Sequence, residues 1–478
     1  MSAVVSCPAL LIAAPSSGSG KTSLVAALAR WHTRRGRRVK VFKCGPDFLD
    51  PQIHAMASGQ PCDNLDLWIC GEDDIRARLA RTARDNDLIL VEGVMGMFDG
   101  QPSSADIAER FGLPVVAVID ARAMAQTFGA VALGLANFRP GLPFHGVFAN
   151  RTGGERHTES ARDALPIGIA WRGALAGNEA ATLPSRHLGL LPAAEIDDLL
   201  ARIDLLADAL DTTPLAKLPP AVRFAAPDAA PSPQRLAGKK IAIARAAAFC
   251  FIYPANLELL AALGAESLFF SPLAGDSLPA CDAVWLPGGY PELHAERLAA
   301  RHDLAQQLTA HIEAGQPLLA ECGGMMPLFE SLADLDGRSH PMLGLLPGRT
   351  VMGKRLAALG SQRIELPEGV LRGHAFHHSR CQTDWPVLAQ AERIDGSPGE
   401  SVWRKRRLTA SYFHFYFPSN PEAVAALFDP AFRHSERNVH EHNSEIRNRG
   451  PRWRWPRRSR IAHAQGGAPD PLRGRAGL

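Results

Sequence analysis

Short apolar runs alternate with helix-like stretches along the first third of the chain. Residues 8–14, 39–42, 88–91, 115–119 and 145–148 are such runs, and turns rich in Gly, Pro or Asp follow them. A strand that is buried on both faces needs a continuous apolar run, as in a parallel sheet covered by helices. The pattern predicts a doubly wound α/β domain over residues 1–210.

The rhythm breaks between residues 211 and 238, where prolines and alanines accumulate. Repeated prolines remove backbone donors and stiffen the chain, so this segment is predicted to be an interdomain linker without regular structure. Apolar runs resume at residues 240–244, 283–286, 317–320 and 408–413. They predict a second doubly wound α/β domain over residues 239–432.

Residues 433–478 are rich in Arg, His, Gly and Pro and lack aliphatic periodicity. Such a segment cannot bury enough apolar surface to offset the entropy of ordering, so we expect a disordered tail. Binding of an acidic partner by its Arg and Trp residues is the functional alternative.

Composition excludes several classes of protein. The chain is 46% hydrophobic and 21% charged, with a net charge of +3, which argues against a dedicated nucleic-acid binder. Its eight cysteines are scattered without zinc-site spacing, which is typical of reduced thiols. No secretion signal is visible, and the apolar runs are shorter than the roughly 20 residues that span a bilayer. We expect a cytoplasmic protein with no nucleic-acid or membrane partner.

A glycine-rich loop follows the first predicted strand and precedes a helix. The residues expected to bind the nucleotide are Ser17, Gly18, Ser19, Gly20, Lys21, Thr22 and Ser23. In such loops backbone N–H groups surround phosphate oxygens, the lysine reaches the terminal phosphates, and the threonine hydroxyl binds Mg²⁺. Pro15 stands where the usual first glycine falls. Gly20, Lys21 and Thr22 between a predicted strand and a predicted helix nevertheless predict ATP binding with Mg²⁺.

Carboxylates follow the neighbouring strands, at the sheet edge that faces the ligand crevice. Asp47 and Asp50 lie between two prolines and are suited to bind Mg²⁺ or to orient a substrate, although aspartate also favours turns. Glu92 ends a strand and is predicted to bind metal or to face the γ-phosphate. Asp99 lies in a loop with glycines and is predicted to face the substrate. This arrangement suits phosphoryl transfer.

Cys322 is the candidate nucleophile of the second domain. It follows an apolar strand and precedes two glycines, as in a nucleophile elbow, and we expect a following helix N-terminus to lower the pKa of its thiol. Amides of Gly323 and of a second glycine loop, Gly288 and Gly289, are predicted to stabilise an oxyanion. The candidate bases are His374, His377, His378 and His414. We prefer His414 because it lies near the end of a late strand.

These motifs together resemble the cobyrinate a,c-diamide synthases, including the hydrogenobyrinate-specific enzymes, over roughly residues 7–430. The segments that carry the resemblance are Ser-Gly-Ser-Gly-Lys-Thr at 17–22, Gly-Pro-Asp-Phe-Leu-Asp-Pro at 45–51, Asn-Leu-Asp at 64–66, Val-Glu-Gly-Val-Met-Gly-Met-Phe-Asp-Gly at 91–100, Arg-His-Leu-Gly-Leu at 186–190, Pro-Gly-Gly-Tyr-Pro-Glu at 287–292 and Ala-Glu-Cys-Gly-Gly at 320–324.

The resemblance implies a dethiobiotin-synthetase-like ATP domain of the P-loop NTPase type, joined to a class I glutamine amidotransferase domain. ATP would convert the a and c acetate carboxylates of hydrogenobyrinate or cobyrinate to acyl phosphates in cobalamin biosynthesis. Ammonia released from L-glutamine by Cys322 and His414 would then form the amides. By the same resemblance, Lys21 and Thr22 hold ATP and Mg²⁺, and Asp47 and Glu92 belong to the Mg²⁺ site. Phe48, Leu49 and Asp99 would lie toward the corrin substrate, and Asp50 is the further candidate substrate residue from the residue pattern.

Three positions depart from the family pattern. The glutamate found two residues after the base in many amidotransferases is absent, because Tyr416 stands there, which reduces the triad to a Cys–His dyad. Ala246 replaces an expected aspartate, and Pro327 replaces an expected tyrosine.

Several alternatives stay open at this point. One is a cobyric acid synthase, which the 45–51 segment disfavours, and another is amidation of a nickel tetrapyrrole. A third is a partitioning ATPase with an inactive glutaminase-like domain, which the intact Cys322 disfavours. The cobalt state of the substrate, the order of amidation and a homodimer are also open.

Overall fold

The computed structural model describes residues 4–186, 189–190, 192–227 and 233–432. The predicted tail, residues 228–232 of the predicted linker, and His187 and Leu188 of the 186–190 motif lie outside the described residues. Both predicted α/β domains fall within a single unit, Met1–Phe432.

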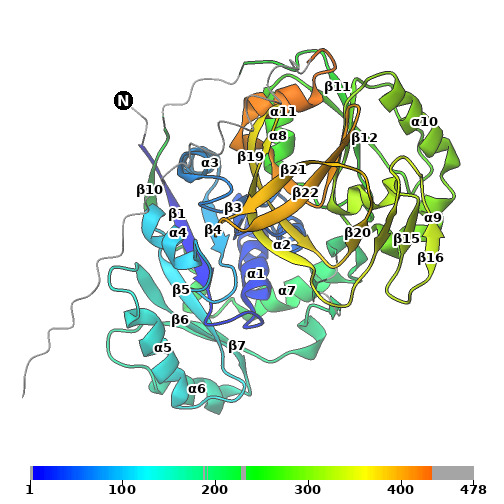
Figure 1. Cartoon of the computed structure of the whole chain (residues 1–478). Helices are drawn as coiled ribbons and strands as arrows, with labels where there is room; N and C mark the ends of the chain where they lie inside the picture. Colours follow the sequence, from blue (N-terminus) through cyan, green and yellow to red (C-terminus); the bar gives the residue numbers. More distant parts are fainter. Residues whose placement is uncertain (1–3, 187–188, 191, 228–232, 433–478) are drawn as a thin grey trace, which may run out of the picture. The chain divides into compact units, whose positions relative to one another are not determined.

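The first sheet has seven strands in the order β3-β2-β4-β1-β5-β6-β7, and all of these neighbours are parallel. An eighth strand, β10, pairs antiparallel with β1. In Figure 1 most of these strands are blue to cyan. Their bounds are β1 Val4–Ala13, β2 Val39–Cys44, β3 Asp63–Leu65, β4 Leu88–Glu92, β5 Val115–Asp120, β6 Phe144–Thr152, β7 Trp171–Ala176 and β10 Ala221–Ala225. The short strands β8 (Ser185–Arg186) and β9 (Gly189–Leu190) form a separate pair.

Strand β10 corrects the prediction that residues 211–238 lack regular structure. Val222 and Phe224 alternate with exposed neighbours and are buried in the core of the first domain. This short alternation is enough for an edge strand, and the prolines on either side limit it to five residues. The segment therefore leaves the first sheet only after adding a strand to it.

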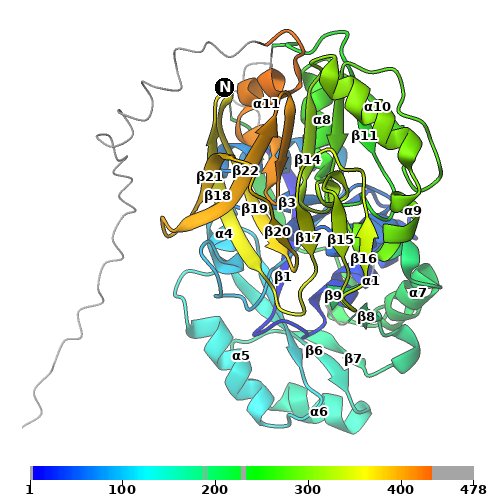
Figure 2. The same ribbon diagram turned by 45° about the vertical axis from the view of Figure 1, so that its right-hand side comes forward.

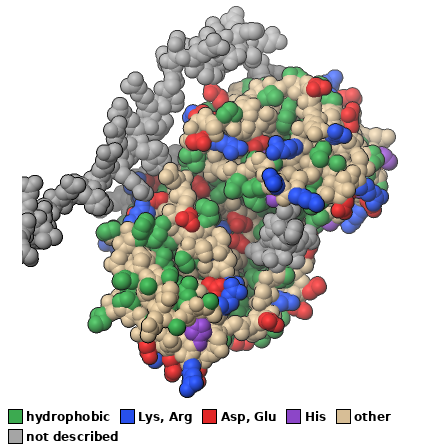
Figure 3. Space-filling model, turned by 60° about the horizontal axis from the view of Figure 1, so that its bottom comes forward, with side chains coloured by type: hydrophobic (Ala, Val, Ile, Leu, Met, Phe, Trp, Pro, Cys, Tyr) green, Lys and Arg blue, Asp and Glu red, His purple; other side chains and the backbone are tan. Residues whose placement is uncertain are grey.

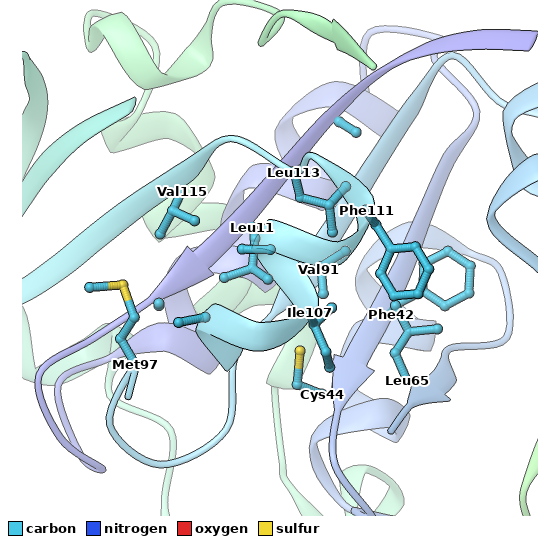
Figure 4. Packing of buried hydrophobic residues seen from close by; sticks show 14 of the residues in the cluster. Leu11, Phe42, Cys44, Leu65, Val91, Met97, Ile107, Phe111, Leu113 and Val115 are labelled. Atoms are coloured by element: carbon cyan, nitrogen blue, oxygen red, sulfur yellow. The ribbon is translucent and has the colours of Figure 1, made fainter. Parts of the chain in front are cut away.

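Helices cover both faces of the first sheet, as a doubly wound fold requires. Helices α1 (Lys21–Thr33), α2 (Asp50–Ser58) and α7 (Leu199–Ala209) pack on one face. Helices α3 (Glu72–Asp85), α4 (Ser104–Phe111), α5 (Thr127–Asn137) and α6 (Glu155–Asp163) pack on the other. Figure 4 shows part of this second layer, where Ile107 and Phe111 of α4 meet strand residues such as Leu11 and Val91. The predicted doubly wound architecture is confirmed.

The second sheet has ten strands in the order β12-β11-β13-β14-β23-β22-β21-β18-β19-β24. The first five are parallel to their neighbours and the rest are antiparallel. Their bounds are β11 Lys240–Ala244, β12 Glu266–Phe270, β13 Ala283–Leu286, β14 Leu318–Glu321, β18 Ala358–Leu366, β19 Gly369–His377, β21 Val387–Arg393, β22 Pro398–Lys405, β23 Leu408–Ser411 and β24 His414–Tyr416.

The predicted strand at 408–413 ends two residues early, and a separate strand follows it. Strand β23 ends at Ser411, whose hydroxyl accepts the backbone N–H of Phe413 at 3.0 Å. That bond turns the chain, so that β24 begins at His414 and pairs with β19 instead of continuing beside β14. The candidate base therefore opens a new strand.

Helices α9 (Ala295–Ala299) and α10 (His302–Glu313) cover one face of this sheet, and α8 (Pro254–Ala262) and α11 (Pro421–Phe428) cover the other. A smaller sheet contains β15 (Ser331–Ala333), β16 (Ser339–Pro341), β17 (Arg349–Val351) and β20 (Arg380–Gln382). Figure 2 shows its strands side by side.

Among the described residues, no helix is both long and apolar enough to cross a bilayer. On the face drawn in Figure 3, acidic and basic side chains are interspersed. The predicted ATP residues lie at or just after the ends of β1, β2 and β4, and the predicted glutamine residues lie shortly after the ends of β13, β14 and β23. Each candidate site thus lies at the carboxyl ends of parallel strands, where open α/β sheets bind ligands.

Candidate active sites

The phosphate loop, residues 15–23, joins β1 to α1. Gly18 and Gly20 have φ angles of +78° and +98°, which side chains rarely adopt. A Cβ at Gly20 would also lie 2.0 Å from the amide nitrogen of Asn150. Ser17 is exposed, Ser19 is buried, and Ser23 lies half-buried in the first turn of α1. The loop therefore needs its glycines for conformation and for close approach.

Two residues at the end of β6 hold this loop from outside. Asn150 donates to the Ser19 carbonyl at 2.9 Å, and Arg151 donates to the Gly18 carbonyl at 2.8 Å. Arg151 is also paired with Asp120 at 2.7 Å. Sequence reasoning missed both residues, because nothing local to them indicates that β6 ends beside the loop.

Lys21 lies inside the loop rather than in solvent. Its ammonium donates to the carbonyl oxygens of Ser16 at 3.1 Å and Met95 at 2.6 Å. Burial lowers the pKa of Lys21 to about 8. A phosphate group would be a stronger acceptor than these two carbonyls. Lys21 could therefore exchange them for a terminal phosphate, which keeps it the candidate for that role.

Glu92 is the centre of a buried network. It accepts the Thr22 hydroxyl at 2.8 Å and the Lys43 ammonium at 2.9 Å, and its second oxygen contacts His54. Burial raises the pKa of Glu92, but Lys43 and His54 outweigh that effect and hold it below its usual value. The structure thus brings together two of the three predicted metal residues, with oxygen donors of the kind Mg²⁺ prefers.

Asp47, the third predicted metal residue, shapes its own turn. Its carboxylate accepts the backbone N–H groups of Leu49 at 2.8 Å and Asp50 at 3.1 Å, at the start of α2. Asn64 holds the same segment by donating to the carbonyls of Gly45 and Asp47. The turn interpretation therefore accounts for what Asp47 contacts here.

Asp50 is part of the Glu92 network through Lys43. Its carboxylate accepts the Lys43 ammonium at 2.5 Å. Burial lowers the pKa of Lys43, but Asp50 and Glu92 outweigh that effect and raise it well above its usual value. The sequence did not single out Lys43 or His54, because they meet Glu92 only through the pairing of β2 with β4 and the position of α2.

The loop with Asp99 packs directly on the phosphate loop. The Asp99 carboxylate accepts the Gly96 N–H at 3.1 Å, and Met97 N–H donates to the Ala14 carbonyl at 2.7 Å. A Cβ at Gly96 would lie 2.6 Å from the Pro15 carbonyl oxygen. Asp99 thus lies next to the nucleotide loop.

Cys322 occupies a strained turn immediately after β14. Its φ of +47° is unusual for a residue with a side chain, as expected of a nucleophile elbow. Its sulfur lies 3.9 Å from the Phe376 carbonyl oxygen. The strain at this one residue supports the assignment of Cys322 as nucleophile.

The expected helix N-terminus behind Cys322 is wrong. Residues Cys322–Gly324 and Met326–Leu328 form two short 3₁₀ turns, and Pro327 lies in the second. Such short turns have no long row of aligned dipoles to stabilise a thiolate. Burial, with nearby glutamates, raises the pKa of Cys322, so the predicted lowering is also wrong for the substrate-free protein.

The two loops with the predicted oxyanion glycines lie against each other, and Gly288 lies against the candidate base. A Cβ at Gly323 would lie 2.5 Å from the carbonyl oxygen of Gly289, and one at Gly288 would lie 2.4 Å from Cε1 of His414. Both glycine loops are therefore in contact, and one of them touches the base. Substitution of either glycine would push these segments apart.

His414 is fully enclosed, and neither of its ring nitrogens has a hydrogen-bond partner within the described part of the chain. Its ring stacks on His374, with centroids 4.8 Å apart and planes at 18°. Burial, followed by His374 and His377, lowers the pKa of His414 well below its usual value. The imidazole is therefore neutral in the substrate-free protein.

The other candidate histidines have different partners. His374 contacts the Tyr253 hydroxyl at 2.8 Å through Nδ1. His377 stacks on Tyr412 at 3.8 Å and lies 3.3 Å from Glu400. His378 stacks edge-on against Phe376. Of these three histidines, His374 is the one whose ring stacks on His414.

Phe48, predicted to face the substrate, contacts the second domain. Its ring centroid lies 4.6 Å from Tyr253, 5.0 Å from His414 and 5.1 Å from Phe251. The segment 47–50 therefore connects the Glu92 network at one end with the glutamine site at the other. The sequence did not predict the contact between Phe48 and His414, because these residues are far apart in the chain.

The two unusual positions have ordinary packing roles. Ala246 forms a tight turn in which its carbonyl accepts the Phe249 N–H at 2.8 Å. Pro327 is buried and its carbonyl accepts the Leu343 N–H at 2.9 Å. Neither blocks the turn at Cys322.

The fold and the two sites define a glutamine amidotransferase joined to a nucleotide-binding domain. Residues 240–422 match the CobB/CobQ-like glutamine amidotransferase domain, and residues 10–180 match the CobQ/CobB/MinD/ParA nucleotide binding domain. The chain is 57% identical over 426 residues to a hydrogenobyrinate a,c-diamide synthase of Pseudomonas aeruginosa, which covers 89% of this chain and 98% of that protein.

Two further relatives agree. The enzyme of the same description from Stutzerimonas stutzeri is 57% identical over 89% of this chain and 99% of its own length. A cobyrinate a,c-diamide synthase of Herminiimonas arsenicoxydans is 47% identical over 89% and 97%. The chain belongs to the hydrogenobyrinate and cobyrinate a,c-diamide synthase family, which confirms the resemblance carried by the sequence motifs.

Proposed function

We propose that this protein amidates the a and c acetate carboxylates of hydrogenobyrinate or cobyrinate with ATP and glutamine, in cobalamin biosynthesis. The observation that carries the proposal is the convergence of a strained Cys322, the Gly288 loop and His414 in the same chain as a phosphate loop. The printed names of the relatives supply the substrate class. Those relatives align over both domains, which favours this proposal over a partitioning ATPase with an inactive glutaminase-like domain.

At the ATP site we assign binding of the terminal phosphates to Lys21 and to the backbone amides of residues 17–20. Thr22 and Glu92 would hold Mg²⁺, since their oxygens are 2.8 Å apart. A bound Mg²⁺ neutralises charge on the phosphates. Among the described residues no group of three or more His, Cys, Asp or Glu side chains could hold a metal, and a Mg²⁺ site of this kind takes its other ligands from phosphates and water.

The reaction at this site activates a poor electrophile. An oxygen of the acetate carboxylate attacks the γ-phosphorus and ADP departs, leaving an acyl phosphate. Ammonia then attacks the acyl carbon and inorganic phosphate departs, leaving the amide. We assign Phe48, Leu49, Asp50 and Asp99 to the side of the site that faces the tetrapyrrole, and Asp47 to the turn that orients them.

At the glutamine site the Cys322 thiol gives its proton to His414 while the sulfur attacks the side-chain amide carbon of glutamine. Amides of Gly323, Gly288 and Gly289 are assigned to the oxyanion. His414 returns the proton to the departing nitrogen, which leaves as ammonia and yields a glutamyl thioester. Water then hydrolyses the thioester to glutamate and restores the thiol.

The cellular setting is a smaller part of the proposal. All eight cysteines are free thiols. Free thiols are usual in a reducing compartment, which supports the cytoplasm. The domain limits we propose are 1–210 for ATP and tetrapyrrole binding and 239–432 for glutamine hydrolysis.

The test is product mass. Purified protein with ATP, Mg²⁺ and glutamine is given hydrogenobyrinate or cobyrinate, and we expect two successive replacements of a hydroxyl by an amino group. The proposal is refuted if the protein converts neither hydrogenobyrinate nor cobyrinate. Cys322→Ala should lose amidation with glutamine and keep it with ammonium salt, whereas Cys381→Ala, the matched control in the same domain, should keep both. If Cys322→Ala loses amidation with both glutamine and ammonium salt, the division into two sites is contradicted.

A further inference from the structure

Strand β24 pairs with β19 along one edge, and side chains hold the backbone next to the candidate base along the other. Strand β24 is the last strand of the second sheet. The Phe415 N–H donates to Oε1 of Glu321 at 3.0 Å, and the Phe415 carbonyl accepts the side-chain amide of Asn256 at 2.8 Å. Asn256 also accepts the Phe417 N–H at 2.8 Å. The free edge of β24 is therefore satisfied by Glu321 and Asn256.

Glu321 is directly bonded in the chain to Cys322. Its side chain is 2% exposed, and its second oxygen accepts the indole N–H of Trp285 at 3.2 Å. Through its first oxygen it reaches the residue that follows His414. One buried carboxyl thus joins the strand of the nucleophile to the strand of the base.

The ring of His414 has no carboxylate to orient it. Neither ring nitrogen is hydrogen-bonded within the described residues, so the position of the ring depends on its backbone and on the rings of His374 and Phe48 packed against it. Of the side chains that hold this backbone, Glu321 is the one that is also fixed to Cys322. We propose that Glu321 is a positioning residue that sets His414 relative to Cys322, in place of the glutamate missing from the triad.

Burial supports this role. A carboxyl removed from water is costly unless its oxygens are hydrogen-bonded. Burial raises the pKa of Glu321 to about 8, against the opposite effect of the N–H groups of Phe415 and Trp285. A leucine would fill the same space without that cost, but it would leave the Phe415 N–H buried without an acceptor. The carboxyl is thus needed for the backbone bond and not for volume.

The inference rests on the proposed Cys322–His414 dyad, and the test separates the two. Glu321→Leu keeps the volume and removes the acceptor, whereas Glu321→Gln keeps a carbonyl for Phe415 N–H and loses the bond from Trp285. Since an unsatisfied buried N–H costs about 1–3 kcal/mol, we expect Glu321→Leu to lower kcat for glutamine hydrolysis by about 10- to 100-fold. The milder Glu321→Gln should lower kcat for glutamine hydrolysis by about fivefold, at the scale of one ordinary hydrogen bond.

A positioning role predicts a selective loss: glutamine-dependent turnover falls while ammonium-dependent amidation does not. General damage to the fold would lower both. In both variants, ammonium-dependent amidation and the KM for glutamine should stay within about twofold of the parent, because the ATP site and the substrate pocket keep their groups. Asp334→Asn is the matched control. Asp334 also accepts backbone N–H groups, those of Asp336 and Arg338, but in an exposed turn of the same domain, so glutamine hydrolysis should be unchanged.

Equal kcat for glutamine hydrolysis in Glu321→Leu and parent would overturn the inference. If Glu321→Leu does not fold, Glu321→Gln decides: a fall in its ratio of glutamine-dependent to ammonium-dependent turnover supports the inference, and an unchanged ratio overturns it. Failure of the dyad looks different, because Cys322→Ala would then still hydrolyse glutamine.

Discussion

The ring of Phe48, from the ATP domain, lies 5.0 Å from the ring of His414, the candidate base of the glutamine domain. Phe48 belongs to the turn that Asp47 closes, and the next residues lead to Asp50, which is paired with Lys43. Lys43 in turn binds Glu92 beside the phosphate loop. One short segment therefore contacts both sites.

We predict that Phe48→Ala impairs glutamine-dependent amidation more than ammonium-dependent amidation. Loss of the ring removes aromatic contacts with His414, Phe251 and Tyr253 that are worth about 0.5–1.5 kcal/mol each. Steady-state rates with the two nitrogen sources should show a selective loss of about tenfold. Phe138→Ala is the control, because Phe138 is 74% exposed and stacks only on Phe98 among the ring contacts of the described residues. An equal loss with both sources in Phe48→Ala would assign Phe48 to the tetrapyrrole alone.

Local features of the sequence predicted the conformation of the two candidate loops. The glycine loop before α1 and the Cys-Gly-Gly turn after β14 are set by residues adjacent in the chain, and the structure has both where they were expected. The first fold was predictable for the same reason, since each buried strand is a continuous apolar run. Strand β10 was missed because a five-residue alternation between prolines resembles a linker.

Contacts between distant segments could not be predicted. Lys43 and His54 surround Glu92 only because β2 pairs with β4 and α2 follows β2. The pKa of Cys322 was expected to fall, but burial raises it, and burial depends on the whole domain. Spacing in the sequence shows which groups carry chemistry, whereas their charge states follow from packing.

Glu92 and Asp47 should differ in their effect on Mg²⁺. Glu92→Gln removes the carboxylate that accepts the Thr22 hydroxyl, so we predict that the Mg²⁺ concentration for half-maximal amidation rises more than tenfold, at the scale of one lost charge-assisted bond. Asp47→Asn keeps an oxygen for the N–H groups of Leu49 and Asp50 and should raise it less. Titration of Mg²⁺ at saturating ATP measures both. The reverse order would identify Asp47 as the principal ligand.

ATP affinity should weaken above pH 8. The pKa of Lys21 is lowered to about 8 by burial, so the free protein loses this positive charge as pH rises through 8. Phosphate binding favours the charged lysine, and the bound state must then take up a proton. Calorimetric Kd values for ATP should rise by up to about tenfold for each pH unit between 8 and 9.5. Lys21→Arg stays charged and should show no such slope, whatever its affinity at pH 7.

Stability should fall in mild acid partly because of His32. This histidine of α1 is 1% exposed, and its Nδ1 accepts a hydrogen bond from Arg37 at 3.0 Å. Burial, then Arg37 and Arg35, lowers the pKa of His32 to about 4. The unfolded chain, with a pKa near 6.5, binds the proton first, so this contribution is complete above pH 6.5 and is lost as pH falls toward 4. The loss from this one group reaches about 2 kcal/mol at pH 5.

His32→Asn isolates that contribution, because the asparagine oxygen can accept from Arg37 but does not titrate. The difference between thermal midpoints at pH 7 and pH 5 should therefore be smaller in His32→Asn than in the parent protein. Other buried histidines, among them His374 with a pKa lowered to about 3 by burial, leave a remaining decrease in both proteins. His302→Asn, at an exposed position of α10, should behave like the parent. If His32→Asn and His302→Asn show the same pH dependence, the buried imidazole of His32 does not weaken the fold in acid.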